Sequence, residues 1–414
     1  MNHVSPRRAA LAVTIVTVAT LLLSACSTSA GSNGSGSTSG DSALAKVSKG
    51  ASQVHVSLES KGGKDVCTLD ATKAKAGPVT FTVKNVSSTA ITEVELQSDE
   101  RILGEKENLA PGLGAVSFTV TLTGGRYELY CPGADRQTQA FTVTGKAQQT
   151  SSNAQTALQS GITGYAAYVT QEVNNMISAT DALNTAVDSG DVAAAQSAYA
   201  EARPYYERVE SDVDGFVLPG FTPTDNAGNL DYLIDMRASN LDPKVGWHGF
   251  HAVERDLFQA KKITASTKTL AAELDANVKK LDALTKSLTY KPEDLANGAS
   301  DLLEEVQTSK ISGEEESYSH IDLLDFAANI EGAQQAFAYL QPGLTIIDPV
   351  LTKSIVAQFA SVNTLLEKYK DPSALGGYVR YTAAVKSADA PTLSAAVEAL
   401  HENLAKIAEK VATA

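Results

Sequence analysis

The stretch Val116-Ser-Phe-Thr-Val-Thr-Leu122 alternates apolar and polar residues, which is the pattern of a strand with one buried face. Similar alternation occurs at residues 79–84, 91–96 and 141–144. Turn residues such as Gly62-Gly63 and Pro132-Gly133 punctuate these segments. Short alternating strands at this spacing predict an all-β sandwich over residues 50–147.

The pattern becomes helical from residue 150 onward. Alanine is frequent, strand alternation stops, and apolar residues recur at helical spacing in 270–288 and 355–366. Candidate caps and first-turn residues are Ser151 or Ser152, Asp191, Pro292 and Pro391. Residues 150–414 are therefore expected to form an all-α bundle of about eight helical segments.

The first residues predict export. Arg7-Arg8 precedes an apolar run from Ala9 to Leu23, which has the length of a signal peptide rather than of a membrane span. Leu23-Ser-Ala-Cys26 resembles a lipobox, so we expect a signal peptide over 1–25 and a lipid on Cys26. A Ser/Gly-rich tether over 26–49 follows. This places the protein in the cell envelope, anchored to the outer face of the membrane. An ordinary secretory signal with an incidental cysteine is the alternative.

Two further cysteines, Cys67 and Cys131, lie in the predicted sandwich. In an exported protein an even pair most simply forms a disulfide, and a thiolate metal pair is the alternative.

The charge balance excludes some classes of partner. The predicted signal peptide carries two of the 34 Lys and Arg residues and none of the 48 Asp and Glu residues, so the mature chain has a net charge of −16. Such a chain is unsuited to nucleic acid or anionic lipid. The charge suits a protein that gathers cations, although it also serves simple solubility.

The run Gly249-Phe-His-Ala-Val-Glu-Arg-Asp-Leu-Phe258 places an imidazole and a carboxylate three positions apart on an expected helix. His251 and Glu254 then share one face and can reach a single ion. The alternative is a solvated helix face.

Two other segments are acidic. Glu207 and Glu210 repeat the same spacing on a helix that Pro204 is expected to kink. In the second segment, Ser312 and Glu315 form the pattern of a capping box. On that expected helix, one stripe contains Glu315, Tyr318, Asp322, Asp325 and Asn329. The stripe is either a solvated face or the lining of a polar interior site, and His320 points away from it.

Carboxylates with one imidazole make an oxygen-rich site. Such a donor set suits iron, manganese, calcium or magnesium, with zinc as an alternative. The chain lacks the His-Glu-x-x-His pattern of metalloproteases and the paired Glu-x-x-His motifs of di-iron bundles.

With these motifs the chain resembles the EfeO-type iron-uptake lipoproteins over roughly residues 50–345. The stretches that carry the resemblance are 107–112, 206–210, 234–237, 249–254, 310–315 and 318–326, together with the two cysteines. The resemblance implies an N-terminal all-β cupredoxin-like sandwich followed by an all-α imelysin-like helical bundle.

The resemblance also implies a metal site and a role. The implied ligands are Glu207, Glu210, Asp235, His251, Glu254 and Glu315, with Glu314 as an alternative to Glu315. The ion would be Fe2+ or Fe3+, with zinc, manganese or copper as alternatives. The protein would capture iron and deliver it to a membrane iron permease, beside an exported haem peroxidase-like partner. Two other hypotheses are an imelysin-type metallopeptidase and an interaction module whose acidic faces are solvated.

The sandwich departs from a blue-copper protein. A blue-copper centre needs two His, a Cys and usually a Met, whereas the sandwich contains only His55 and no Met. We therefore expect no blue copper. A second metal site near Cys131 with Glu95 or Glu107 is an alternative to a purely structural, disulfide-bonded sandwich.

Overall fold

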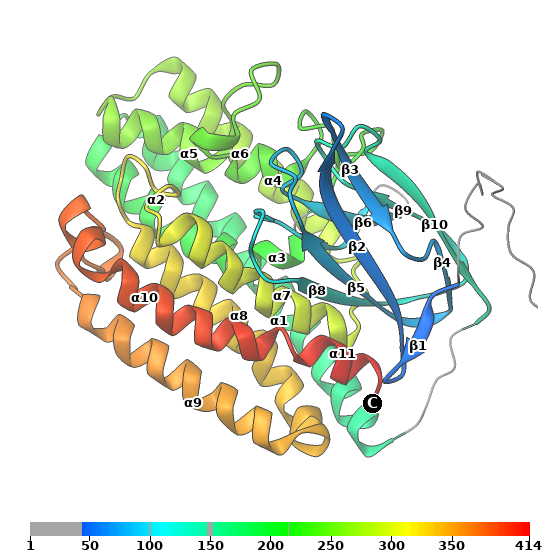
Figure 1. The fold of residues 1–414 in the computed structure, drawn as a ribbon. Coiled ribbons are helices and arrows are strands. Elements are labelled where there is room, and N and C mark those ends of the chain that lie inside the picture. The colour runs from blue at the N-terminus through cyan, green and yellow to red at the C-terminus, as the bar shows by residue number, and fades with distance from the viewer. Residues whose placement is uncertain (1–43, 99–100, 147–151, 214) are drawn as a thin grey trace, which may run out of the picture. The chain divides into compact units, whose positions relative to one another are not determined.

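The computed structural model describes residues 44–98, 101–146, 152–213 and 215–414 (Figure 1). Strands occupy residues 46–144 and helices begin at residue 153, so the predicted fold class, a sandwich followed by a helical bundle, is confirmed. The predicted signal peptide and Cys26 lie outside the described residues.

The first part contains two five-stranded sheets. The strands are β1 (Lys46–Ser48), β2 (Ala51–Lys61), β3 (Lys64–Leu69), β4 (Lys73–Lys75), β5 (Gly77–Asn85), β6 (Val94–Ser98), β7 (Arg101–Lys106), β8 (Val116–Leu122), β9 (Gly125–Tyr130) and β10 (Thr138–Thr144). One sheet has the order β1-β2-β5-β8, with β3 also paired to β2, and the other has the order β4-β10-β9-β6-β7. β1 lies just before residue 50, where we expected the sandwich to begin.

Apolar side chains at alternate strand positions fill the space between the sheets. Phe81 on β5 stacks on Phe118 of β8 with ring centroids 5.1 Å apart, and it meets Phe141 of β10 edge-on at 5.2 Å. All three rings are buried. Because side chains alternate between faces along a strand, the same strands carry polar residues on the other face.

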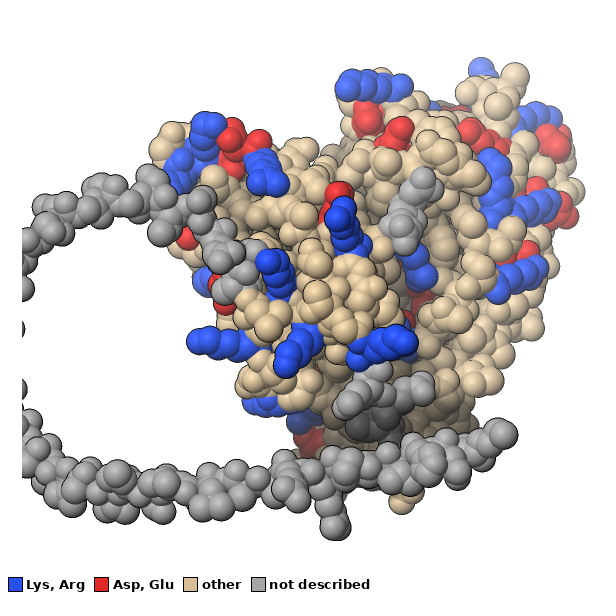
Figure 2. Space-filling view, turned by 90° about the vertical axis from the view of Figure 1, so that its right-hand side faces the viewer, with Lys and Arg blue, Asp and Glu red and all other residues tan. Residues whose placement is uncertain are grey.

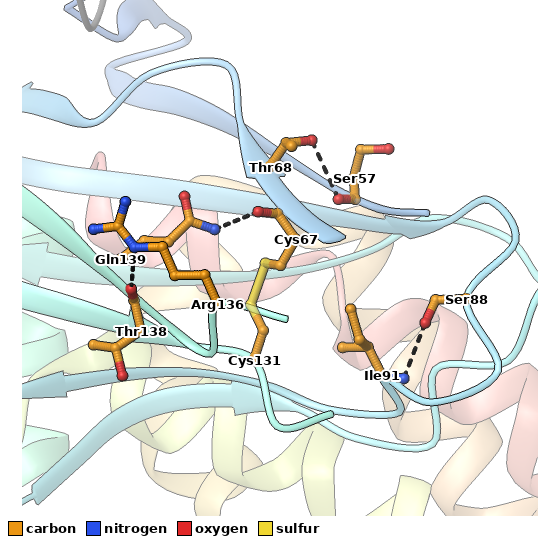
Figure 3. The surroundings of a disulfide bond; sticks show 9 residues. All are labelled: Ser57, Cys67, Thr68, Ser88, Ile91, Cys131, Arg136, Thr138 and Gln139. Carbon is orange, nitrogen blue, oxygen red and sulfur yellow. Dashed lines mark hydrogen bonds between the residues drawn. A yellow bond between two sulfur atoms is a disulfide. The ribbon is translucent and has the colours of Figure 1, made fainter. Parts of the chain in front are cut away.

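A disulfide joins the two sheets (Figure 3). Cys67 lies in β3 of the first sheet, and Cys131 directly follows β9 of the second. The side-chain amide of Gln139 on β10 donates a hydrogen bond to the carbonyl of Cys67, which adds a second link between the sheets.

Loss of this disulfide should destabilise the sandwich. The cysteines are 64 residues apart, and closing a loop of that length stabilises the fold by about 4 kcal/mol in the chain-entropy model. We expect the Cys67→Ser/Cys131→Ser variant to unfold at lower denaturant concentration than the native protein. Thiol titration of the non-reduced exported protein should detect no free thiol, and two free thiols would contradict the pairing.

The second part is helical. Its α-helices are α1 (Asn153–Ser189), α2 (Val192–Glu207), α3 (Glu210–Val213), α4 (Leu230–Asp235), α5 (Gly249–Glu254), α6 (Ala265–Thr285), α7 (Pro292–Glu305), α8 (Asp322–Ile347), α9 (Pro349–Leu366), α10 (Ala383–Leu404) and α11 (Ile407–Ala412). The described residues thus contain eleven α-helices rather than about eight, because several are single turns. No helix in the described part of the chain is long and apolar enough to cross a membrane.

Local signals located the starts of three helices. The Ser152 hydroxyl accepts a hydrogen bond from the amide of Gln155 at the start of α1, and the Asp191 carboxylate caps α2. Pro292 is the first residue of α7, as predicted. The prediction for Pro391 was wrong, because this residue lies inside α10, which begins earlier at the Thr382 cap.

α2 does not continue through both of its predicted glutamates. It ends at Glu207, and Glu210 begins the separate short helix α3. Pro204 has no amide hydrogen to donate, so the helix is weakened one turn before it ends. The prediction that Glu207 and Glu210 share one kinked helix was therefore wrong.

Polar contacts link the sandwich to α7. The Lys106 ammonium at the end of β7 is buried and pairs with Asp301, and it lies 3.2 Å from Glu304. The amide of Thr121 on β8 donates a hydrogen bond of 2.9 Å to the Glu293 carboxylate. Without these carboxylates the buried Lys106 ammonium would destabilise the fold, because it would be left unpaired. The contacts therefore favour one position of α7 against β7 and β8.

Lys and Arg side chains are prominent on the face of the molecule in Figure 2, and Asp and Glu side chains are fewer there. The chain nevertheless has an excess of acidic residues. Nine of these are buried in the described residues of the helical part, and most of the nine lie in the site described next.

Candidate metal centre

His251 and Glu254 lie on one face of α5, as predicted, and both are buried. The Nδ1 atom of His251 lies 3.0 Å from the Oε2 atom of Glu254. α5 begins at Gly249, whose φ is +71°, and a Cβ there would lie 2.0 Å from the carbonyl oxygen of Ile234. Only glycine allows this approach of α5 to the end of α4.

That approach brings Asp235 to the imidazole. Asp235 is the last residue of α4. The Nε2 atom of His251 lies 3.6 Å from the Asp235 carboxylate and 3.3 Å from the Glu315 carboxylate. One ligand atom from each of Asp235, His251 and Glu315 lies within 4.8 Å of the others, so a single ion could reach all three.

Glu254 lies at Nδ1 of His251, whereas Asp235 and Glu315 lie near Nε2. The Oε1 atom of Glu254 accepts hydrogen bonds from the backbone amides of Tyr318 (2.8 Å) and Ser319 (2.7 Å), while Oε2 faces Nδ1 of His251. A carboxylate that holds Nδ1 fixes the tautomer and the orientation of a metal-binding imidazole. His251, Glu254 and Glu316 form a second group of potential ligands on this side of the ring.

Glu315 comes from a turn rather than from a helix. The predicted capping box at Ser312 was wrong, because residues 311–320 form turns and the Ser312 hydroxyl donates to the carbonyl of Ser309. Gly313 and His320 have φ values of +67° and +59°, which an α-helix does not tolerate. Within this segment Glu315 is buried in the centre, whereas Glu314 accepts a hydrogen bond from the Ser239 hydroxyl nearer the surface.

The acidic stripe lines the interior. Asp322, Asp325 and Asn329 of α8 are buried, so the polar-interior alternative is correct for them. Glu207, Glu315 and Asp325 form another group with ligand atoms within 4.8 Å of one another. His320 is exposed.

Three cations accompany these carboxylates. The buried Arg203 guanidinium pairs with five of them, which are Glu207, Asp235, Glu315, Glu316 and Asp325. The buried Lys310 ammonium lies 3.1–3.7 Å from Glu207, Glu210, Glu305 and Glu315. The Arg237 guanidinium contacts Glu305 and lies 3.0 Å from Glu315.

Lys310 reaches the centre because α7 continues into a π-helical turn, Val306–Lys310. Such turns shift side-chain positions relative to a regular helix and are frequent at functional sites.

The centre favours a bound cation electrostatically. Among the described residues, eight carboxylates pair with Arg203, Arg237 or Lys310, and these carboxylates belong to Glu207, Glu210, Asp235, Glu305, Glu314, Glu315, Glu316 and Asp325. Three permanent positive charges cannot balance eight negative ones, so without a further cation some carboxylates must take up protons.

The pKa values follow this imbalance. Burial raises the pKa of Asp235 to about 6, against the opposing charges of Arg203 and His251. Burial likewise raises the pKa of Glu316 and of Asp325 well above the usual range. Burial opposes ionisation of Glu315 as well, but Lys310 and Arg237 outweigh it and hold its pKa well below the usual range.

Protons also accumulate on the imidazole. Burial alone would lower the pKa of His251, yet the Asp235 charge and the hydrogen bonds to Glu254 and Glu315 raise it well above its ordinary value. Without a metal ion, protonation of His251 is therefore favoured beside the Glu315 carboxylate, whose own pKa is lowered.

The structure thus separates the predicted ligands into groups. Asp235, His251 and Glu315 converge on one position, Glu254 lies at the other ring nitrogen, and Glu207 and Glu210 surround Lys310. The residues that sequence reasoning missed are Arg203, Arg237, Lys310, Glu305 and Glu316. Asp325 lay in the predicted stripe but was not assigned as a ligand.

The described residues of the sandwich contain one further group of potential metal ligands. Cys67 and Cys131 are disulfide-bonded, and His55 on β2 is exposed and hydrogen-bonds to Asp70. Glu93, Glu95 and Glu105 form an acidic group on the second sheet, within 4.8 Å of one another. Glu107 is not a member of that group.

Comparison with known proteins identifies the family of this chain. The Peptidase M75 (imelysin) family model matches residues 161–407, which is more than half of the chain. The chain therefore belongs to the imelysin family.

Relatives that align with most of the chain identify a narrower group within this family. The chain is 33% identical over 337 residues to the iron uptake system component EfeO of Escherichia coli strain K12, and the aligned region covers 80% of this chain and 85% of that protein. The EfeO protein of Shigella flexneri matches over the same shares. Within the imelysins, this chain is a member of the EfeO iron uptake components.

The solved structures include partial matches to the sandwich. Reduced rusticyanin covers 27% of this chain and 89% of its own, with 16% identity and a TM-score of 0.22. Rusticyanin from Thiobacillus ferrooxidans covers 24% of this chain and 86% of its own, with 13% identity and a TM-score of 0.21.

Proposed function

We propose that this protein captures iron outside the cytoplasm and hands it to a membrane iron permease. The relatives are named as components of an iron uptake system, which supports this role. The observation that carries the proposal is the convergence of Asp235, His251 and Glu315 on one buried position. Carboxylates with a single imidazole suit Fe2+ and Fe3+, and they also suit manganese, with zinc as an alternative.

The ion would lie on the Nε2 side of His251, bound by that nitrogen and by the carboxylates of Asp235 and Glu315. Glu254 would hold the imidazole through Nδ1 rather than bind the ion. Glu207 and Glu210 would neutralise Lys310 and so act indirectly. Iron is the cargo in this proposal, so binding must be reversible.

Titration with iron tests the proposal. The purified mature chain should bind a single ferrous ion under anaerobic conditions, or a single ferric ion supplied as citrate, and should retain it through desalting. A chain that retains neither ion would contradict the proposed function. Hydrolysis of a protein substrate that chelators abolish would instead favour a metallopeptidase.

We further propose that Cys26 carries a lipid that tethers the protein to the outer face of the membrane. The Leu-Ser-Ala-Cys run and the Ser/Gly-rich segment after it support this proposal. Metabolic labelling with a fatty acid should tag the wild type and leave Cys26→Ala unlabelled. Equal labelling of the two proteins would rule out Cys26 as the lipidated residue. An exported haem peroxidase-like partner, which family resemblance suggests, would then meet the protein at that surface.

A further inference from the structure

Arg203 has an unusual environment for a cation. It lies on α2, one turn before Glu207, and its side chain is 0% exposed. Its partners come from four segments, namely α2, α4, the turn before α8, and α8 itself. A charge this deeply buried is costly unless carboxylates surround it, and here they do so on nearly every side.

One nitrogen of Arg203 lies between three carboxylates that could otherwise bind a metal ion. Its Nη2 atom lies 3.2 Å from Oε1 of Glu315 and 3.1 Å from Oδ2 of Asp325, and it also contacts Glu207. These three carboxylates offer ligand atoms within 4.8 Å of one another, as do Asp235, His251 and Glu315.

Glu315 links the two groups. Its Oε1 atom lies 3.3 Å from Nε2 of His251 and 3.2 Å from Nη2 of Arg203. Two neighbouring cation positions of the centre therefore share one carboxylate, that of Glu315. The guanidinium of Arg203 already occupies one of these two positions.

We propose that Arg203 is a specificity-determining residue that closes the second cation position, so that the centre takes one metal ion, beside His251. The inference rests on the proposed function, because it assumes an ion at Asp235, His251 and Glu315. A guanidinium stays protonated at every physiological pH, so this position stays closed whatever the proton load of the carboxylates.

Removing the guanidinium should open a second site. Asp325 Oδ1 and Asn329 Oδ1 are buried oxygens that have no hydrogen-bond partner among the described residues. The residue pair Glu207 and Glu315 would complete an all-oxygen donor set of the kind that Mn2+ accepts.

Counting bound Mn2+ tests this inference. The mature chain is titrated with Mn2+, and free Mn2+ is measured by its electron paramagnetic resonance signal. We expect one ion per chain in the wild type and two in Arg203→Met, in which a shorter, uncharged side chain replaces the guanidinium. Arg208→Met is the matched control, because Arg208 lies one residue past α2 and pairs with Glu172 and Glu331 outside the centre. It should bind one ion.

A second pair of variants decides the question if Arg203→Met does not fold. Asp325 contacts Arg203 and lies outside the proposed ion position, so Asp325→Asn should change Mn2+ affinity less than threefold, whereas Asp235→Asn should lower it by ~100-fold. Equal losses in both variants would overturn the inference, as would one ion in a folded Arg203→Met or two ions in the wild type. A wild type that binds neither Mn2+ nor iron would overturn the proposed function itself.

Discussion

Replacing His251 with alanine should lower the affinity for ferrous iron by at least ~100-fold, because this residue supplies the single nitrogen of the proposed site. The remaining carboxylates of Asp235 and Glu315 would still attract cations. They would do so with less preference for transition metals over Ca2+ or Mg2+, which favour oxygen ligands. Anaerobic competition against a chelator of known affinity measures the change for each metal.

Glu254 should give a smaller and graded effect. Its carboxylate holds Nδ1 of His251 and is itself held by two backbone amides, so its loss should misorient the imidazole. We expect Glu254→Ala to lower iron affinity by ~10–100-fold, which is the usual effect of removing such a partner. An effect of Glu254→Ala as large as that of His251→Ala would show that Glu254 binds the ion directly.

Two controls separate loss of the site from loss of the fold. His320→Ala removes an exposed imidazole of the same protein and should leave affinity unchanged. Thermal unfolding of each metal-free variant shows whether it is folded at the temperature of the titration. If folded His251→Ala and folded Glu254→Ala both bind iron as the wild type does, the ion binds elsewhere.

Signals within a few residues of one another predicted much of this fold. Alternation located the strands because each of them buries one face, and the Ser152 and Asp191 side chains satisfied the first amides of α1 and α2. The error at Ser312 has a local cause too. Ser312 and Glu315 have the spacing of a capping box, but Gly313 between them adopts a left-handed backbone conformation. A helix therefore cannot form there.

The candidate centre could be predicted only in part. His251 and Glu254 were found because one helix turn sets their separation, and the stripe on α8 was visible for the same reason. Arg203 and Lys310 could not be recognised, because a cation on a helix normally lies in water and only the packed structure shows that these two are buried.

Iron affinity should fall steeply as the pH falls. Metal binding requires a neutral imidazole, whereas the metal-free centre raises the pKa of His251 well above its ordinary value of about 6.5. Protons therefore compete with iron throughout the neutral range, and not only near 6.5 as an isolated histidine would suggest. Below the raised pKa, affinity should fall ~10-fold per pH unit, since one proton is exchanged for each ion.

A second proton should join below the pKa of Asp235, which is about 6. Both groups have raised pKa values, so acid stabilises the metal-free form in each case and the two effects add. The slope should then approach ~100-fold per pH unit. Calorimetry in buffers of different ionisation enthalpy counts the protons directly, and about one should leave per ion bound at neutral pH. A pH-independent affinity between pH 5 and pH 8, with no proton released, would show that the ion does not bind to His251; a steep dependence would make local acidification a sufficient trigger for release to a permease.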